Sequence, residues 1–400
     1  MDLVIERLAA GGDGVGRGAD GRVVFVPFTA PGDRVRVRIT SVRPRFARGR
    51  VLELLAPGPA RAQPVCTVFG RCGGCAWQHV EYTAQLEAKR AIVEDAIGRI
   101  AGLALPGPIA VAASPSPWAW RSRTRVLARG GRVGYRRRSS HALEPVSGCP
   151  VLVPALDERL RALATSTPPD GELELAVGDD EPRCAALAGD SAAPAGPRIG
   201  LRVGGDRLEI SPGVFFQAHA QLRDALRDAA LAAAGEGELA ADVFAGAGFF
   251  TLGLARRFAR VIAVEAAPAA AADLRRNAAA AACPNVEVLE ASVENARDRL
   301  RRAEVLVLDP PRTGLPGGVA ESLADGSAAR IVYVSCEPST LARDLAAFAA
   351  RGYVMTRAAA FDLFPQTPHV EVLVALERAR GPSESGRVDS PPEPPARGRA

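Results

Sequence analysis

Two short segments near the carboxyl end of the chain carry side chains suited to covalent chemistry. Cys336 directly follows the apolar run 331–335, and Glu371 stands two residues after His369 at the start of a later apolar run. A cysteine just beyond a buried strand and ahead of a helix lies where positive potential can lower its pKa and make it a nucleophile. A lone cysteine is more often a small core residue. The carboxylate near His369 favours the first interpretation, because the two segments can face each other.

A second set of cysteines lies in the first half of the chain. Cys66, Cys72 and Cys75 fall within ten residues, and Cys149 supplies a fourth thiol. Four thiolates can hold either a zinc ion or an iron–sulfur cluster, and the spacing does not decide between them. The first residues carry acids and glycines instead of a signal sequence, so we expect a cytoplasmic protein whose cysteines are thiols or metal ligands.

A glycine-rich segment at 242–250, Asp-Val-Phe-Ala-Gly-Ala-Gly-Phe-Phe, has the pattern of a strand, a tight turn and a helix start. Glycines there let a ligand approach the backbone, and Glu265 ends the next apolar run, where a carboxylate can accept hydrogen bonds from ribose hydroxyls. Thr251 replaces the third glycine of the dinucleotide fingerprint, which disfavours a pyrophosphate. S-adenosylmethionine, with a ribose and a sulfonium but no phosphate, fits better.

Another marker is Asp309-Pro-Pro-Arg312, which directly follows the apolar run 305–308. Prolines at the end of a strand form a rigid lip, and an acid there can orient a cofactor or substrate. Methyltransferases that act on exocyclic amines usually have an aromatic residue after the prolines. Arg312 takes that place here and argues against N-methylation of a base.

From about residue 208, apolar runs alternate with helical patterns, which is typical of a doubly wound parallel sheet. Such a sheet gathers the carboxyl ends of its strands at one edge, so the motifs above would meet there. We predict strands at 239–244, 261–265, 286–289, 305–308, 331–335 and 370–376, and helices at 251–258, 267–282 and 339–350. Residues 1–56 alternate short β-like runs with turns, as in a small barrel.

The positive charge is concentrated in two places. The net charge is only +5, but residues 1–61 carry 11 arginines against 6 acids, and residues 114–141 carry 8 arginines and no acid. Two basic surfaces on an otherwise acidic chain indicate a polyanionic partner. Trp118, Trp120 and Tyr135 lie among these arginines and could either stack on unpaired bases or belong to the core. No apolar run is long enough to span a membrane.

Taken in order, the segments DVFAGAGFF, DPPR, SCEPSTLARD and FPQTPHVEV resemble the RNA uracil-5-methyltransferase family over roughly residues 1–376. The resemblance implies that Cys336 is the nucleophile that adds to C6 of uracil and that Glu371 is the base that removes the C5 proton. It also implies that S-adenosylmethionine is the methyl donor. The implied cofactor-binding residues are Gln217, Phe244, Glu265 and Asp309, with Ser292 as a weaker match.

The resemblance also implies a fold class and an organisation. We expect a Rossmann-like, doubly wound α/β methyltransferase domain at 208–378, a TRAM-like RNA-binding barrel at 1–56, and a disordered tail at 379–400. Between them, residues 57–207 would form a central α+β domain with the arginine-rich RNA-binding segment. In that domain a [4Fe-4S] cluster, favoured over zinc by the resemblance, would be held by Cys66, Cys72, Cys75 and Cys149.

The expected function is methylation of a specific uridine at C5 in structured RNA by a monomeric enzyme. The barrel and the cysteines together favour 23S ribosomal RNA over the T-loop of transfer RNA. A cytosine-5 RNA methyltransferase would need a second cysteine near the proline lip, and a non-catalytic RNA-binding protein would not need Cys336 and Glu371. Two departures from the family are Phe249, where Asn is common, and Glu337, whose charge would raise the Cys336 pKa if the two groups are close.

Overall fold

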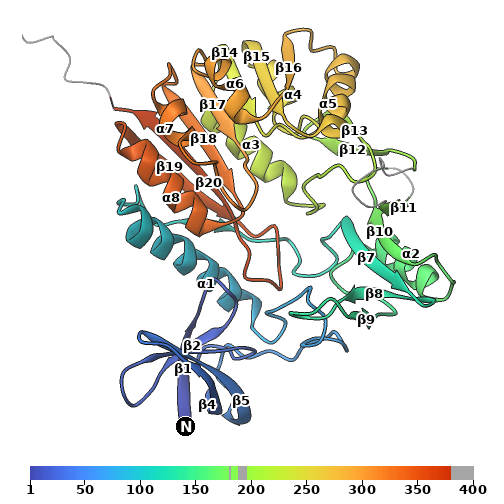
Figure 1. Ribbon diagram of the computed structural model, residues 1–400, viewed down its shortest axis with the longest axis vertical. Coiled ribbons are helices and arrows are strands. Elements are labelled where there is room, and N and C mark those ends of the chain that lie inside the picture. Colours follow the sequence, from blue (N-terminus) through green and yellow to red (C-terminus); the bar gives the residue numbers. More distant parts are fainter. Residues whose placement is uncertain (180–181, 188–195, 380–400) are drawn as a thin grey trace, which may run out of the picture.

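A computed structural model describes residues 1–179, 182–187 and 196–379, and its largest element is an eight-stranded sheet (Figure 1). The strand order is β16-β15-β14-β17-β18-β20-β19-β6, with β14 to β18 parallel. The strands are β6 (Ala110–Ala112), β14 (Gly237–Val243), β15 (Phe258–Glu265), β16 (Val286–Glu290), β17 (Val305–Leu308), β18 (Arg330–Ser335), β19 (Tyr353–Phe361) and β20 (Glu371–Arg378). The predicted doubly wound sheet is confirmed for β14 to β18.

The predicted parallel arrangement does not extend to the other edge of the sheet. Strand β20 is antiparallel to both β18 and β19, and the sequence patterns missed β19. The nine-residue loop 362–370 joins β19 to β20 as a hairpin, and strands joined by so short a connection must run antiparallel. Strand β6, from the middle of the chain, adds to β19 in parallel.

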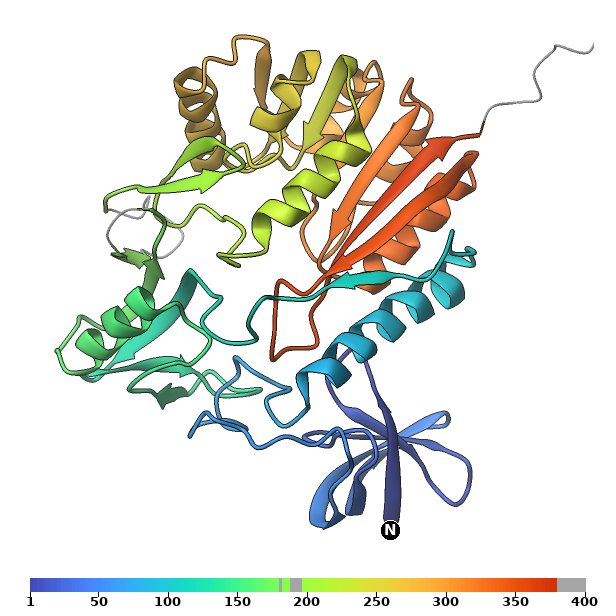
Figure 2. The ribbon, with the colours of Figure 1, turned by 180° about the vertical axis from the view of Figure 1, so that it is seen from behind.

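Helices cover both faces of this sheet (Figures 1 and 2). Apolar side chains of η1, α6, α7 and α8 pack on one face in one core cluster, whereas those of α3 and α4 pack on the other. The helices are α1 (Tyr82–Asp95), which continues as the π-helix η1 (Ala96–Ala101), α3 (Arg223–Ala234), α4 (Thr251–Ala255), α5 (Pro268–Ala280), α6 (Val293–Leu300), α7 (Val319–Ala324) and α8 (Pro338–Ala349). The helices predicted near 251, 267 and 339 begin within one residue of α4, α5 and α8.

The amino-terminal strands close into a barrel, as predicted. Alternate residues of β4 (Arg34–Val42) are buried, because its Val-Arg alternation turns valines inward and arginines toward solvent. Closure removes the exposed edges that an open sheet of this size would have. The other strands are β1 (Asp2–Leu8), β2 (Gly14–Arg17), β3 (Val23–Val26) and β5 (Phe46–Ala56).

Between the barrel and the large sheet, the chain forms a five-stranded sheet with α2 (Pro154–Ala164) packed against it. Figures 1 and 2 show this sheet on the opposite side of the molecule from the barrel, and the loop 362–370 descending from the large sheet. Its strands are β7 (Arg123–Arg129), β8 (Arg132–Arg136), β9 (Leu143–Pro145), β10 (Gly171–Ala176) and β11 (Arg183–Leu187). The hairpin of β12 (Ile199–Val203) and β13 (Asp206–Ile210) packs on α5 instead.

The predicted disordered tail at 379–400 lies outside the described residues except for Ala379. Across the ranges described above, no helix combines the length and apolar character needed to cross a membrane.

Candidate active site

Cys336 and Glu371 meet at the carboxyl edge of the parallel strands. Cys336 follows β18 and Glu371 begins β20, and the register that pairs Ser335 with Val372 sets these two residues opposite each other. The Glu371 side chain is buried, whereas Cys336 is half-buried and remains accessible. The predicted nucleophile and base are therefore brought together by adjacent strands.

The surroundings of this pair disfavour negative charge. Burial, together with the carboxylates of Glu371 and Asp309, raises the pKa of the Cys336 thiol to about 12. Burial and Asp309 also raise the pKa of Glu371 well above its usual value. Glu337, which we considered as a cause of such a shift, instead caps α8 by accepting hydrogen bonds from Ser339. The acids that act on the thiol are thus Glu371 and Asp309.

Arg312 is a site residue that we did not assign from the sequence. The positive charge of its guanidinium lowers the pKa of both Cys336 and Glu371. Its backbone carbonyl accepts a 3.0 Å hydrogen bond from Thr340 Oγ1, which ties the proline lip to the start of α8. In the sequence, Arg312 stands out only because it replaces an aromatic residue, although a cation near a thiol and two acids favours their charged forms.

The raised pKa of Cys336 predicts how its reactivity depends on pH. Since the thiolate is the reactive form, the rate of iodoacetamide labelling of Cys336 should rise about tenfold per pH unit between roughly pH 7 and 9. Peptide mapping by mass spectrometry would measure labelling at this cysteine alone. Replacing Glu371 with Gln should accelerate labelling at any given pH, because it removes a charge that raises the thiol pKa. A plateau below pH 9 would contradict the assignment.

The glycine turn lies at the same edge of the sheet, after β14, with β17 between β14 and β18. Gly246 has φ +55°, and a Cβ added to it would meet no atom within 4 Å, so its surface is open to a ligand. Glu265, at the end of β15, accepts hydrogen bonds from the backbone N–H of Gly246 (2.9 Å) and Ala267 (2.7 Å). Phe244 has a left-handed backbone, at φ 65°, and lines a small cavity with Ser292. Three of the predicted cofactor-binding positions thus surround one turn.

Gln217 reaches the same edge from the other side. Gln217 is buried and its side chain lowers the pKa of Asp309, while burial and the charge of Asp242 raise that pKa to about 7. The segment that carries Gln217 is fixed to the middle of the chain, because the backbone N–H of Ser122 donates to the carbonyl of Ala218 at 2.8 Å. The fold therefore places Gln217 and Asp309 together, next to the reactive pair.

The four cysteines of the amino-terminal half line one cavity. Cys66, Cys72, Cys75 and Cys149 form its walls together with Trp120, Tyr135 and Thr367. Polar groups fix their backbones: Gln78 Oε1 accepts from the N–H of Cys66 at 3.1 Å, and Asp157 Oδ1 accepts from the N–H of Cys149 at 2.6 Å. Burial raises the pKa of Cys72 to about 11 and that of Cys75 to about 12.

Two further observations bear on what this cavity can hold. Within the described ranges, no group of three or more His, Cys, Asp or Glu side chains has the arrangement for a metal ion. The buried indole Nε1 of Trp120, a residue in the cavity wall, has no hydrogen-bond partner in the part of the chain described. Four thiols and one unpartnered donor suit a bound group that accepts hydrogen bonds at sulfur.

The segment 114–141 contains no acidic residue, but in the fold acidic side chains from outside this segment pair with its arginines. In the fold, Glu174 pairs with Arg123, Glu172 with Arg136 and Glu144 with Arg137. Arg121, Arg125 and Arg138 line a groove with the three paired arginines. The charge of the groove is therefore lower than the sequence alone indicates, although it remains basic.

The aromatic residues of that segment have different roles. Trp120 is 3% exposed and stacks on His219 with ring centroids 5.4 Å apart, so it is a core residue. Tyr135 is half-buried and lines both the groove and the cysteine cavity. Trp118 is half-buried, and the groove walls do not include it.

The sheet order, the antiparallel β20 and the glycine turn after β14 define the fold of an S-adenosylmethionine-dependent methyltransferase. The chain is similar to the tRNA (uracil-54, C5)-methyltransferase of Pyrococcus abyssi, solved with S-adenosyl-L-homocysteine. The TM-score is 0.74 at 24% identity, covering 94% of this chain and 100% of that one. This likeness shows that the two proteins share a fold along their length.

Sequence comparisons identify the family. The profile described as tRNA (Uracil-5-)-methyltransferase matches residues 207–379, and that of the TRAM domain matches residues 1–52. The 23S rRNA (uracil(1939)-C(5))-methyltransferase RlmD of Chromohalobacter salexigens is 34% identical over 96% of this chain and 91% of its own length. RlmD of Pseudomonas aeruginosa is 34% identical over 94% and 93%. The chain belongs to the RNA uracil-5-methyltransferase family, and the predicted resemblance is confirmed.

Proposed function

We propose that the protein transfers a methyl group from S-adenosylmethionine to C5 of a uridine in 23S ribosomal RNA through a covalent enzyme–RNA adduct. The observation that carries the proposal is the placement of Cys336 opposite Glu371, at the edge where the glycine turn lies open. A thiol and a carboxyl group facing one another are the two groups that methylation at an unactivated C5 requires.

The chemistry follows from these two side chains. The Cys336 thiolate adds through Sγ to C6 of uracil, and the electrons of the C5–C6 double bond make C5 nucleophilic. C5 then bonds to the methyl carbon as the carbon–sulfur bond of the sulfonium breaks, which releases S-adenosylhomocysteine. Glu371 accepts the proton from C5, the double bond forms again, and the thiolate leaves C6.

Arg312 offsets part of the effect that burial and the two acids have on the thiol. The positive charge of Arg312 favours the thiolate that adds to C6, because it lowers the pKa of Cys336. The raised pKa of Glu371 makes its ionised form a stronger base toward the C5 proton. We propose that Gln217, Phe244, Glu265 and Asp309 bind the methyl donor around the glycine turn, with Glu265 toward the ribose.

Ribosomal RNA is the favoured substrate because relatives named for 23S ribosomal RNA cover more than nine-tenths of this chain at 33–34% identity. Nucleoside analysis of RNA from a strain that lacks the gene would test this choice. We expect 5-methyluridine to be lost from one position in 23S ribosomal RNA and retained in transfer RNA. If 5-methyluridine were lost from transfer RNA alone, the substrate would be transfer RNA and the proposed reaction would stay the same.

We propose that RNA lies across the arginine groove and the barrel. Arg138 lines both this groove and a second one on the barrel, and its guanidinium lies 4.8 Å from the Phe28 ring centroid. Arg125 is exposed on β7 and makes no ion pair with any residue that the structure describes. A strand that follows both grooves would meet cationic groups and an aromatic ring, as single-stranded RNA requires.

Replacing Arg125 with Ala should weaken RNA binding and make it less dependent on salt. The slope of log affinity against log salt concentration should fall by roughly 0.7–0.9, as for the loss of one phosphate contact. Arg297→Ala, which removes an exposed arginine from α6, is the matched control and should leave the slope unchanged. Fluorescence anisotropy with a labelled RNA fragment at several salt concentrations would measure both. Equal slopes for the two variants would place the RNA elsewhere.

We also propose that Cys66, Cys72, Cys75 and Cys149 hold a [4Fe-4S] cluster that fixes the segments they belong to. The shared cavity and the unpartnered Trp120 indole N–H support this group, and its role would be structural. Protein purified without oxygen should contain about four iron atoms per chain. Cys149→Ser should lose most of that iron, whereas Cys184→Ser, on β11, should keep it. Zinc without iron in the unaltered protein would refute the cluster.

These assignments place RNA binding and catalysis in different parts of the chain. We propose that residues 1–56 and 57–207 bind RNA and that residues 208–378 bind the methyl donor and perform the reaction. The cytoplasmic location and the monomeric state stay predictions from the sequence.

A further inference from the structure

The loop 362–370 leads directly into Glu371, the proposed base. It leaves β19 after Phe361 and returns to β20 at Glu371, and these two residues are register partners across the hairpin. Any shift of the loop therefore reaches the proposed base directly. The contacts that hold the loop therefore set the orientation of the Glu371 carboxyl group toward C5 of a uracil bound at Cys336.

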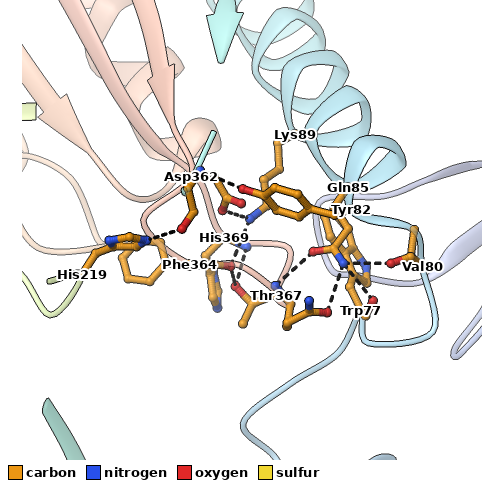
Figure 3. Close-up of polar contacts among 12 residues, drawn as sticks. Trp77, Val80, Tyr82, Gln85, Lys89, His219, Asp362, Phe364, Thr367 and His369 are labelled. Atoms are coloured by element: carbon orange, nitrogen blue, oxygen red, sulfur yellow. Dashed lines mark hydrogen bonds and ion pairs between the residues drawn. The ribbon is translucent and has the colours of Figure 1, made fainter. Parts of the chain in front are cut away.

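Helix α1 holds this loop with side chains from one face. Tyr82, Gln85 and Lys89 stand three and four residues apart, so they project from the same side of the helix. Figure 3 shows Gln85 and Lys89 turned toward the loop and Tyr82 beside them. The helix comes from the first quarter of the chain, whereas the loop comes from its end.

The first contact is a buried ion pair. Lys89 Nζ pairs with the Asp362 carboxylate, and both side chains are 0% exposed. Lys89 Nζ also donates a 3.0 Å hydrogen bond to the carbonyl oxygen of Phe364. One ammonium group thus ties two points of the loop, and a buried charge of this kind is stable only while its partner is in place.

The second contact is a pair of amide hydrogen bonds. Gln85 Nε2 donates to Gln366 Oε1 at 3.1 Å, and the backbone N–H of Gln366 donates to Gln85 Oε1 at 3.0 Å. Gln366 has φ 68°, a conformation that a non-glycine residue adopts only when its surroundings hold it. Its carbonyl accepts from the N–H groups of Ala76 and Trp77, both at 3.0 Å, so the segment after Cys75 holds the loop as well.

We propose that Lys89 and Gln85 are positioning residues for the proton-abstraction step: they hold the loop 362–370 so that Glu371 reaches the C5 proton after methyl transfer. The inference rests on the proposed function and adds to it two residues far from the reacting atoms in sequence. Neither side chain touches substrate, and both act through the loop.

The test separates the two chemical steps in single-turnover reactions. RNA carrying tritium at C5 of uridine reports proton removal, and methyl-labelled S-adenosylmethionine reports methyl transfer. In Gln85→Ala, we expect methyl transfer to change less than about threefold while tritium release slows about tenfold, with a labelled covalent protein–RNA adduct accumulating. Binding of S-adenosylmethionine should not change, because the glycine turn is untouched.

A second variant guards against loss of folding. Lys89→Met alone leaves Asp362 buried without a counter-charge, so the double variant Lys89→Met with Asp362→Asn removes both charges while still losing the bond to Phe364. It should fold and show the same delay in tritium release. Arg183→Met, which removes a partner of buried Glu174 in the middle sheet, is the matched control and should keep the two steps coupled.

The outcomes are distinct. If tritium release keeps pace with methyl transfer in both loop variants, as in the unaltered protein, the inference is overturned. If both steps slow by the same factor, the contacts serve stability alone and it is overturned too. If the unaltered protein forms no 5-methyluridine, the proposed function fails instead.

Discussion

Replacing Cys336 with alanine should abolish methyl transfer to RNA, with a fall in turnover of about 10⁴-fold or more. The thiol stands opposite Glu371 at the end of β18 and is the group that adds to C6 of uracil in the proposed reaction. Without that addition, C5 stays too weak a nucleophile to accept the methyl group. Incorporation of labelled methyl into RNA would measure the loss.

The matched control is Cys283→Ala, because Cys283 is buried in an apolar cluster with residues of β12, β13 and α5, away from the reactive pair. It should cost some stability and leave turnover close to that of the unaltered protein. Thermal unfolding of both variants would show that the effect at position 336 is chemical. If Cys336→Ala kept turnover within about tenfold of the original, another group would be the nucleophile.

Replacing Glu371 with glutamine should leave a covalent protein–RNA adduct that carries the new methyl group. Glutamine keeps the shape of the buried side chain but cannot accept the C5 proton, so elimination of Cys336 stalls. Adduct formation itself should proceed, since removing the carboxylate lowers the pKa of the thiol. Denaturing electrophoresis with labelled RNA would detect the complex.

Glu337→Gln is the control for this prediction. Glu337 follows Cys336 directly, but its side chain caps α8, and a glutamine oxygen can accept the same hydrogen bonds from Ser339. We expect no adduct to accumulate in that variant. Rapid turnover by Glu371→Gln without a stable adduct would show that a different group removes the proton.

The positions of Cys336 and Asp309 at this edge could be predicted because each directly follows a strongly apolar strand. The run 331–335 ends at Cys336 and the run 305–308 ends at Asp309, and parallel strands bring such ends to one edge. The antiparallel direction of β20 was not predictable in this way, because apolar runs carry no strand direction. It is this direction that sets Glu371 opposite Cys336.

Several features that could not be predicted from the sequence are ion pairs between residues from different segments of the chain. The arginines of 114–141 looked unopposed, yet Glu144, Glu172 and Glu174 reach them from strands β9 and β10. Lys89, the only lysine of the chain, is 273 residues away from Asp362, so no local pattern could show that pair. Such pairings depend on the folded topology.

The labelled nucleoside is the most direct measure of the central claim. The unaltered protein, incubated with methyl-labelled S-adenosylmethionine and unmodified 23S ribosomal RNA, should place the label in 5-methyluridine after digestion to nucleosides. The Cys336→Ala protein should place none. Label found in 5-methylcytidine or in an N-methylated base, or no label from the unaltered protein with either ribosomal or transfer RNA, would contradict the account.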